Sequence, residues 1–124
     1  MKTPIRPAEP GGAPLSKGMI ANGFCFVAGH GGRDPRTGEL AAGIEAQTRQ
    51  SLANIESVLA EAGLDLRDVV KVNAWVANLE DVPGYNRVYA ELMPAPHPVR
   101  ATVGSALQGG MLVEIEATAA LREA

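Results

Sequence analysis

The 124-residue sequence has few of the residues on which several functional classes depend. It contains one cysteine, Cys25, so no disulfide can form within the chain, and we expect a cytoplasmic protein. Phe, Trp and Tyr together make up 4% of the residues, too few for a platform on which nucleic-acid bases stack. No apolar run approaches the ~20 residues needed to span a bilayer, and no secretory signal is visible, so we expect no membrane partner.

The chain also lacks an excess of positive charge. Its 11 Lys and Arg residues stand against 14 Asp and Glu residues, which gives a formal net charge of −3. Binding along nucleic-acid phosphates requires clustered positive charge, so this balance argues against a nucleic-acid partner. Hydrophobic residues account for 46% and charged residues for 20%, as in a soluble globular protein. We therefore expect a single domain that covers residues 1–124.

Hydrophobic periodicity predicts an α+β domain with the element order β-β-α-β-α-β-β and both helices on one face of the sheet. Asn22-Gly23 between two short apolar runs predicts the first hairpin. Four prolines in residues 1–14 predict an extended arm. The predicted elements are strands at 19–21 and 24–28, a helix over 43–62, a strand over 69–77, a helix over 82–92, and strands over 99–103 and 111–119.

The last two predicted strands carry the residues most suited to chemistry. Their connection, residues 105–110, is short, which favours an antiparallel hairpin. Alternation then places Arg100 opposite Glu114 or opposite Glu116, depending on where the turn is centred. In either register an Arg, Thr102 and a carboxylate share one face of the sheet. We expect the helices to cover the other face, which carries Val99, Ala101, Val103, Val113 and Ile115.

Each of these polar residues also has a purely structural interpretation. Arg100 and Glu114 can form an ordinary cross-strand ion pair worth at most ~1 kcal/mol on an exposed sheet face. Glu116 fits a structural or interface carboxylate. His30 lies in a glycine-rich stretch (residues 29–32) after a strand, where it can contact a ligand or be a solvated loop residue. The histidines and the cysteine have no metal-ligand spacing, so we expect no metal site.

Several segments together resemble the reactive-intermediate deaminase family (RidA/YjgF), and the resemblance covers nearly the whole chain. The final strands carry Pro98-Val99-Arg100-Ala101-Thr102-Val103 and Leu112-Val113-Glu114-Ile115-Glu116-Ala117. Further similar segments are Phe26-Val27-Ala28-Gly29, the turn over 34–40, residues 47–55 of the first helix, and Tyr85-Asn86-Arg87-Val88-Tyr89 of the second.

The resemblance implies a chorismate-mutase-like fold assembled as a homotrimer, with sites at the subunit interfaces. It also implies a deaminase of the 2-iminobutanoate/2-iminopropanoate type, which hydrolyses 2-imino acids to 2-keto acids and ammonia without a cofactor. Arg100 would hold the substrate carboxylate, which suits the planar fork of a guanidinium. Glu114 would position the attacking water. Asn86 and the backbone near Gly29 and Thr102 would complete the pocket.

Two positions depart from the family pattern. Leu15 stands where a tyrosine commonly lines the site, and His30 stands where a glutamine is common. We therefore include both among the substrate-binding positions, as the residues that alter the substrate range. The alternatives to a deaminase are a trimer that binds a keto acid without turnover and an endoribonuclease, although the charge balance argues against the latter. The polar sheet face, with Trp75, Leu112 and Thr102, should be buried between subunits.

Overall fold

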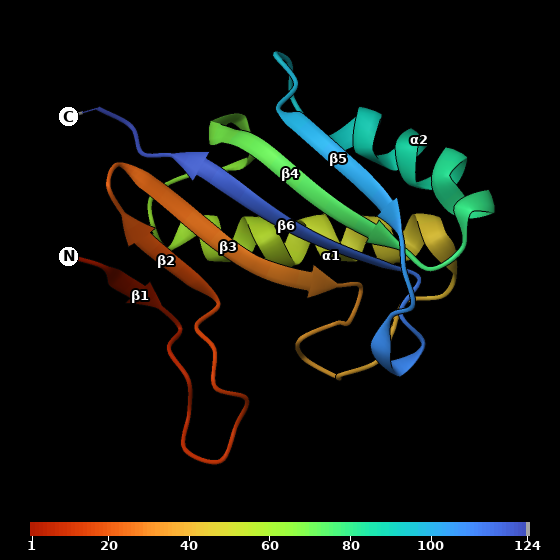
Figure 1. The fold of residues 1–124 in the computed structure, drawn as a ribbon, viewed down its shortest axis with the longest axis horizontal. Coiled ribbons are helices and arrows are strands. Elements are labelled where there is room, and N and C mark those ends of the chain that lie inside the picture. Colours follow the sequence, from red (N-terminus) through yellow and green to blue (C-terminus); the bar gives the residue numbers. More distant parts are fainter. Residues whose placement is uncertain (124) are drawn as a thin grey trace.

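The structure, a computed structural model, describes residues 1–123, in which six strands form one mixed sheet and two α-helices cover one of its faces (Figure 1). The strands are β1 (Thr3–Ile5), β2 (Gly18–Ala21), β3 (Phe24–Gly31), β4 (Val69–Val76), β5 (Val99–Gly104) and β6 (Val113–Ala120). The helices are α1 (Gly43–Ala60) and α2 (Val82–Leu92), with short 3-10 helices η1 (Leu66–Asp68), η2 (Leu79–Asp81) and η3 (Gln108–Gly110). The α+β class and the positions of both helices are confirmed.

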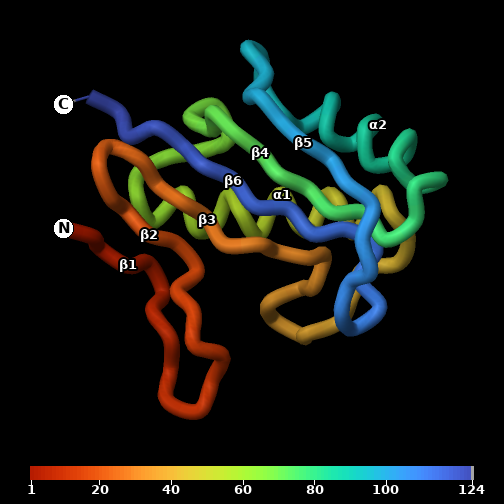
Figure 2. The backbone as a smooth tube through the Cα atoms, in the orientation of Figure 1, coloured from red at the N-terminus to blue at the C-terminus, as the bar shows by residue number. Residues whose placement is uncertain are grey.

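The N-terminal region contains one strand more than the sequence predicted. Ile5 is buried, and β1 pairs antiparallel with β2 at the edge of the sheet. Pro4 is compatible with this position because an edge strand need not donate every backbone hydrogen bond. Residues 6–17 then form a long loop that projects away from the sheet (Figure 2).

The predicted β2–β3 hairpin is confirmed. Asn22 and Gly23, at its turn, both have a positive φ, 51° and 84°, as a two-residue type I′ turn requires.

The predicted hairpin between the last two strands is wrong. The strand order is β1-β2-β3-β6-β4-β5, so β4 separates β5 from β6. β5 lies parallel to β4, joined to it through α2, while β6 lies antiparallel to both β3 and β4. The short 105–110 connection carries the chain across the end of β4, where Ser105 N–H donates to Val76 and Ala77 N–H donates to Leu112.

This topology also corrects the predicted faces of β5. Arg100 and Thr102 lie in register with Val72 and Ala74, which are buried beneath the helices. The helix-covered face of β5 is therefore the polar one. Val99, Ala101 and Val103 lie on the opposite face, which no helix covers and which we call the open face. The parallel partner strand, and not the hydrophobicity of β5 itself, determines this orientation.

The core lies between the sheet and the helices and includes Leu52, Ile55 and Leu59 of α1 together with Val113 and Ile115 of β6. One side of α1 is polar yet buried. There Ser51 Oγ donates to the His30 carbonyl at 2.6 Å, and Asn54 Nδ2 donates to the carbonyls of Gly31 and Arg33. Gln47 accepts from Leu112 N–H at 2.8 Å. These bonds satisfy backbone groups where β3 ends and β6 begins, and so fix the segment beside Glu114.

Candidate functional site

Arg100 is held in place by side chains of α2. Its Nη2 donates to Asn86 Oδ1 at 2.6 Å, and its guanidinium carbon lies 4.7 Å from the Tyr89 ring centroid and 5.4 Å from that of Tyr85. These distances fit a cation–π contact with both rings. The centroids of the two rings lie 5.7 Å apart, so the rings pack against each other and form an aromatic surface under the guanidinium. Because Asn86 uses only one donor, the other N–H groups of the guanidinium remain for a ligand.

Three hydroxyl groups at this aromatic surface are buried, and none of them makes a hydrogen bond within residues 1–123. They belong to Tyr85, Tyr89 and Thr102. The Thr102 hydroxyl is close enough to Tyr85 to influence its titration, but not in hydrogen-bonding geometry. Burial raises the pKa of Tyr89 to about 12, and the neighbouring Tyr85 adds to this effect, while Arg100 opposes it. Burial likewise raises the pKa of Tyr85. Both rings therefore stay neutral at physiological pH and pack beneath Arg100 as apolar faces.

An open cavity of about 290 Å³ lies next to the guanidinium. Arg100, Asn86 and Tyr89 form one side of it, and His97 with Pro98, from the loop before β5, form another. A small carboxylic acid fits this volume, and Arg100 is the cation that lines it.

Glu114 lies on the open face, on the other side of the sheet from Arg100. Its neighbours in register are Gly31 of β3 and Trp75 of β4, while Val113 and Ile115 on either side of it are fully buried under the helices. The carboxylate lies directly over Gly29, because a Cβ atom placed on Gly29 would come within 2.2 Å of Glu114 Oε2. A glycine at position 29 thus makes room for the carboxylate.

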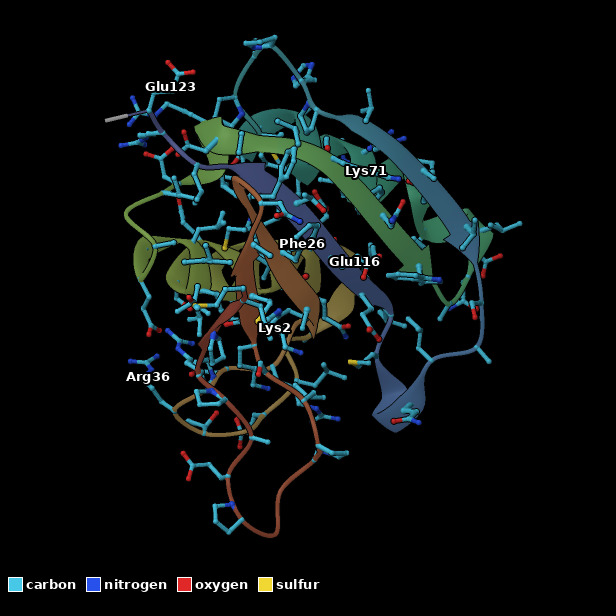
Figure 3. The ribbon with its side chains drawn as sticks, turned by 60° about the vertical axis from the view of Figure 1, so that its left-hand side comes forward. Lys2, Phe26, Arg36, Lys71, Glu116 and Glu123 are labelled. Carbon is cyan, nitrogen blue, oxygen red and sulfur yellow. The ribbon has the colours of Figure 1, made fainter. Side chains whose placement is uncertain are left out.

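Leu15 and Glu116 line a second cavity, of about 470 Å³, on the open face. Leu15 comes from the long N-terminal loop, and Met19 and Phe26 of the β2–β3 hairpin lie beside it. Glu116 accepts a hydrogen bond from Asn73 Nδ2 at 3.0 Å, which agrees with a structural role. Figure 3 shows Phe26 and Glu116 on the same face of the sheet. The cavity wall therefore combines the apolar side chains of Leu15, Met19 and Phe26 with the charged groups of Lys2 and Glu116.

His30 lies away from both Arg100 and Glu114. A bulge between Val27 and His30 turns its side chain to the helix-covered side, in register with buried Ile115. Its Nδ1 lies 2.6 Å from the Ala28 carbonyl oxygen. Burial lowers the pKa of His30, and the charges of Lys17 and Arg6 lower it further, against the effect of the Ala28 carbonyl.

The predicted residues thus form two groups within one chain. Arg100, Asn86 and Thr102 lie on the helix-covered face at the β5 edge, whereas Glu114, Gly29 and Leu15 belong to the open face. No group of three or more His, Cys, Asp or Glu residues suited to a metal ion occurs in residues 1–123. In the same residues, no helix is long and apolar enough to cross a membrane.

The packing of Tyr85 and Tyr89 against Arg100 was not predicted from the sequence. The signal was available, because a helix brings residues at i and i+4 to one face, and these are the two tyrosines of the chain. Only the pairing of β5 with β4 shows that Arg100 lies over that face.

Comparisons with known proteins agree with this fold. The family model described as Endoribonuclease L-PSP matches residues 7–121. The chain is 43% identical over 108 residues to a RutC family protein of Pyrococcus horikoshii, covering 86% of each chain. It is 35% identical to the 2-iminobutanoate/2-iminopropanoate deaminase of Dermatophagoides farinae, covering 94% of this chain and 91% of that protein.

Among solved structures, the YjgF gene product of E. coli superimposes with a TM-score of 0.85 at 34% identity, covering 97% of this chain and 96% of that one. The match extends over both helices and the mixed sheet, and therefore includes the strands that carry Arg100 and Glu114. The chain belongs to the reactive-intermediate deaminase (RidA/YjgF) family.

Proposed function

We propose that this protein is a cofactor-independent deaminase of the 2-iminobutanoate/2-iminopropanoate type, which hydrolyses 2-imino acids and their enamine tautomers to 2-keto acids and ammonia. Relatives that bear the name of this activity support the proposal. The observation that carries it is the Arg100 guanidinium, fixed by Asn86 and two tyrosine rings at the wall of an open cavity.

Arg100 binds the substrate carboxylate. A guanidinium held in advance loses little further freedom when a ligand arrives, so more of the interaction remains available for binding. The same contact fixes the orientation of the C=N bond, which is attached to the carbon next to the carboxylate. A small 2-imino acid needs no other strong anchor.

Glu114 handles the water. Its carboxylate accepts a proton from water as the water oxygen bonds to the carbon of the protonated imine, which gives a neutral tetrahedral carbinolamine. It then returns that proton to the nitrogen, and it accepts the hydroxyl proton of the carbinolamine as the C–N bond breaks and the C=O bond forms. That proton leaves with the ammonia as ammonium. One water enters, and one 2-keto acid and one ammonia leave, so neither a metal ion nor a redox cofactor is needed to balance the reaction.

This division of labour requires two chains. Within one chain Arg100 and Glu114 lie on opposite faces of the sheet, with β4 between their strands. We infer that Glu114 of one subunit meets Arg100 of a neighbour, three times in a homotrimer. Exposed apolar side chains on the open face support such an assembly, because Val99 and Val103 at its β5 edge are 69% and 47% exposed in the single chain.

Leu15 sets the preference for the substrate side chain. It lies with Met19 and Phe26 in the open-face cavity, so an apolar side chain gains contact there while a polar one loses solvation. We therefore expect longer aliphatic imino acids to be better substrates than the small or polar ones.

The test is ammonia release from 2-imino acids generated in situ by an amino-acid oxidase. Wild type should accelerate release, whereas Arg100→Ala and Glu114→Gln should lose nearly all of the acceleration. Arg87→Ala, which removes an exposed arginine of α2, is the matched control and should stay active. Binding of a 2-keto acid by wild type without any acceleration would exclude the deaminase and leave a metabolite-binding trimer.

A further inference from the structure

A third cavity, of about 270 Å³, lies where β3 ends on the helix-covered side of the sheet. α1 contributes Asn54 and Ser57 to its wall, and the loop that follows β1 contributes Arg6 and Lys17. His30 belongs to this cavity, which explains why the structure separates it from the catalytic pair. The proposed deamination uses none of its side chains.

The cavity is strongly basic although the chain is acidic. Arg6, Lys17, His30 and Arg33 line it, and no carboxylate is among its lining residues. The net charge of the whole chain is −3, so this grouping reverses the sign of the charge locally. Like charges around one hollow repel each other, and an anion inside it relieves that repulsion.

Two of the four basic groups are held rigidly. Arg33 donates to the carbonyls of Gly38 at 3.1 Å and Gly109 at 2.9 Å. Arg6 is paired with Glu61 and also donates to the Ser57 carbonyl at 3.2 Å. These bonds fix both positive charges beside the cavity before any ligand arrives, which lowers the ordering cost of binding.

The other two basic groups have unused hydrogen-bonding capacity. In residues 1–123 the Lys17 ammonium takes part in none of the ion pairs. The Nδ1 atom of His30 is engaged with the Ala28 carbonyl, so Nε2 is the ring nitrogen left for a ligand. The ring is only partly exposed, and Lys17 and Arg6 face it while no carboxylate of the lining does.

We propose that this cavity binds a small phosphate dianion, either inorganic phosphate or the phosphate group of a small metabolite. Glu61 neutralises the charge of Arg6, which leaves the two positive charges of Lys17 and Arg33 in the lining of the cavity. The two negative charges of a dianion would balance them. The negative charge of a bound dianion favours the protonated form of His30, which then donates from Nε2 to a third oxygen. The donors approach the cavity from three elements: β3, the N-terminal loop and the 33–38 turn. The oxygen atoms of a tetrahedral phosphate point in different directions and can accept from all three.

The chain offers a direct probe, since it has only two histidines, His30 in this cavity and His97 beside Arg100. Inorganic phosphate is titrated at constant ionic strength near neutral pH, while both imidazole rings are followed by NMR. The His30 resonances should shift with a saturable curve, and those of His97 should not. Glycerol phosphate is titrated in a second experiment. Tighter binding of inorganic phosphate would identify the free anion as the ligand, and tighter binding of glycerol phosphate would identify a phosphomonoester.

Lys17→Gln should weaken binding by about fivefold or more, because it removes a cation that forms no ion pair in the described part of the chain. Arg67→Gln, which removes an exposed arginine outside the cavity, is the matched control and should leave binding unchanged. Equal shifts of the two histidines, no saturation, or unchanged binding by Lys17→Gln would overturn the proposal. The measurement uses no substrate, so its result is independent of whether the protein deaminates imines.

Discussion

The guanidinium carbon of Arg100 lies 4.7 Å from the centre of the Tyr89 ring. This contact joins the edge strand β5 to helix α2 and places a permanent positive charge against two neutral, buried rings. An arginine on an edge strand would otherwise sample many rotamers in water. The contact fixes the anchor before the substrate binds, so its removal should affect substrate binding more than the chemical step.

Substitutions of Tyr89 test this role. Tyr89→Phe keeps the ring and removes a hydroxyl that has no hydrogen-bond partner within residues 1–123, so activity and stability should stay close to wild type. Tyr89→Leu removes the ring and should raise KM by about three- to thirtyfold, with a smaller change in kcat. Steady-state kinetics of ammonia release give both values. Equal loss in the two variants would contradict a role for the aromatic face.

The tyrosines also predict an alkaline limit to stability. Burial raises the pKa of Tyr89 in the fold to about 12, above the ~10 of a free tyrosine, and raises that of Tyr85 as well. A raised pKa stabilises the fold fully below pH 10, and this stabilisation is lost as the pH rises towards 12. Tyrosinate absorbance should therefore appear in the folded protein well above pH 10, and near pH 10 in urea. Titration of both tyrosines at pH 10 in the native protein would contradict their burial.

Gly29→Ala should impair catalysis more than folding. The new Cβ would meet the Glu114 carboxylate at 2.2 Å, and a flexible side chain can move away at little cost in stability. The displaced carboxylate can no longer hold water at the imine carbon, so kcat should fall by tenfold or more. Urea unfolding should show a loss below about 1 kcal/mol. In a double mutant with Glu114→Gln the two losses should not add, because both remove the same carboxylate.

Gly32→Ala, unlike Gly29→Ala, should lower the stability of the fold. Gly32 is buried, and its new Cβ would lie 2.6 Å from the backbone Cα of Gln47 in α1, which cannot move without shifting the helix. The expected cost is about 1–3 kcal/mol of unfolding free energy. Urea unfolding of Gly32→Ala beside Gly29→Ala measures the contrast directly, and equal stability of the two variants would contradict the packing of α1 against this turn.

The fold could be predicted as far as local patterns determine it. The helical stripe through Leu52, Ile55 and Leu59 predicted α1, and Asn22-Gly23 predicted the first hairpin. The partner of β5 could not be read in this way. The short 105–110 connection is compatible with a hairpin between β5 and β6 as well as with the observed crossing over β4. Only the parallel pairing of β5 with β4 excludes the hairpin.

Some residues of the candidate site were predicted from the sequence, but their arrangement was not. The resemblance pointed to Arg100, Glu114 and Asn86, and the Arg100–Asn86 hydrogen bond places two of them together. The expected pairing of Arg100 with Glu114 within one sheet face was wrong, because β4 lies between their strands. That separation makes a second subunit a requirement of the proposed reaction, in line with the interface sites that the resemblance implies.

The most direct measurement is therefore complementation between two inactive variants. Arg100→Ala and Glu114→Gln subunits are mixed in equal amounts, unfolded and refolded together, and assayed for ammonia release from a 2-imino acid. If Arg100 and Glu114 of different subunits form each site, about a quarter of the sites regain both intact residues, and activity returns to about a quarter of wild type. Activity that stays at the level of either variant alone, while wild type refolds to full activity, would contradict the shared site.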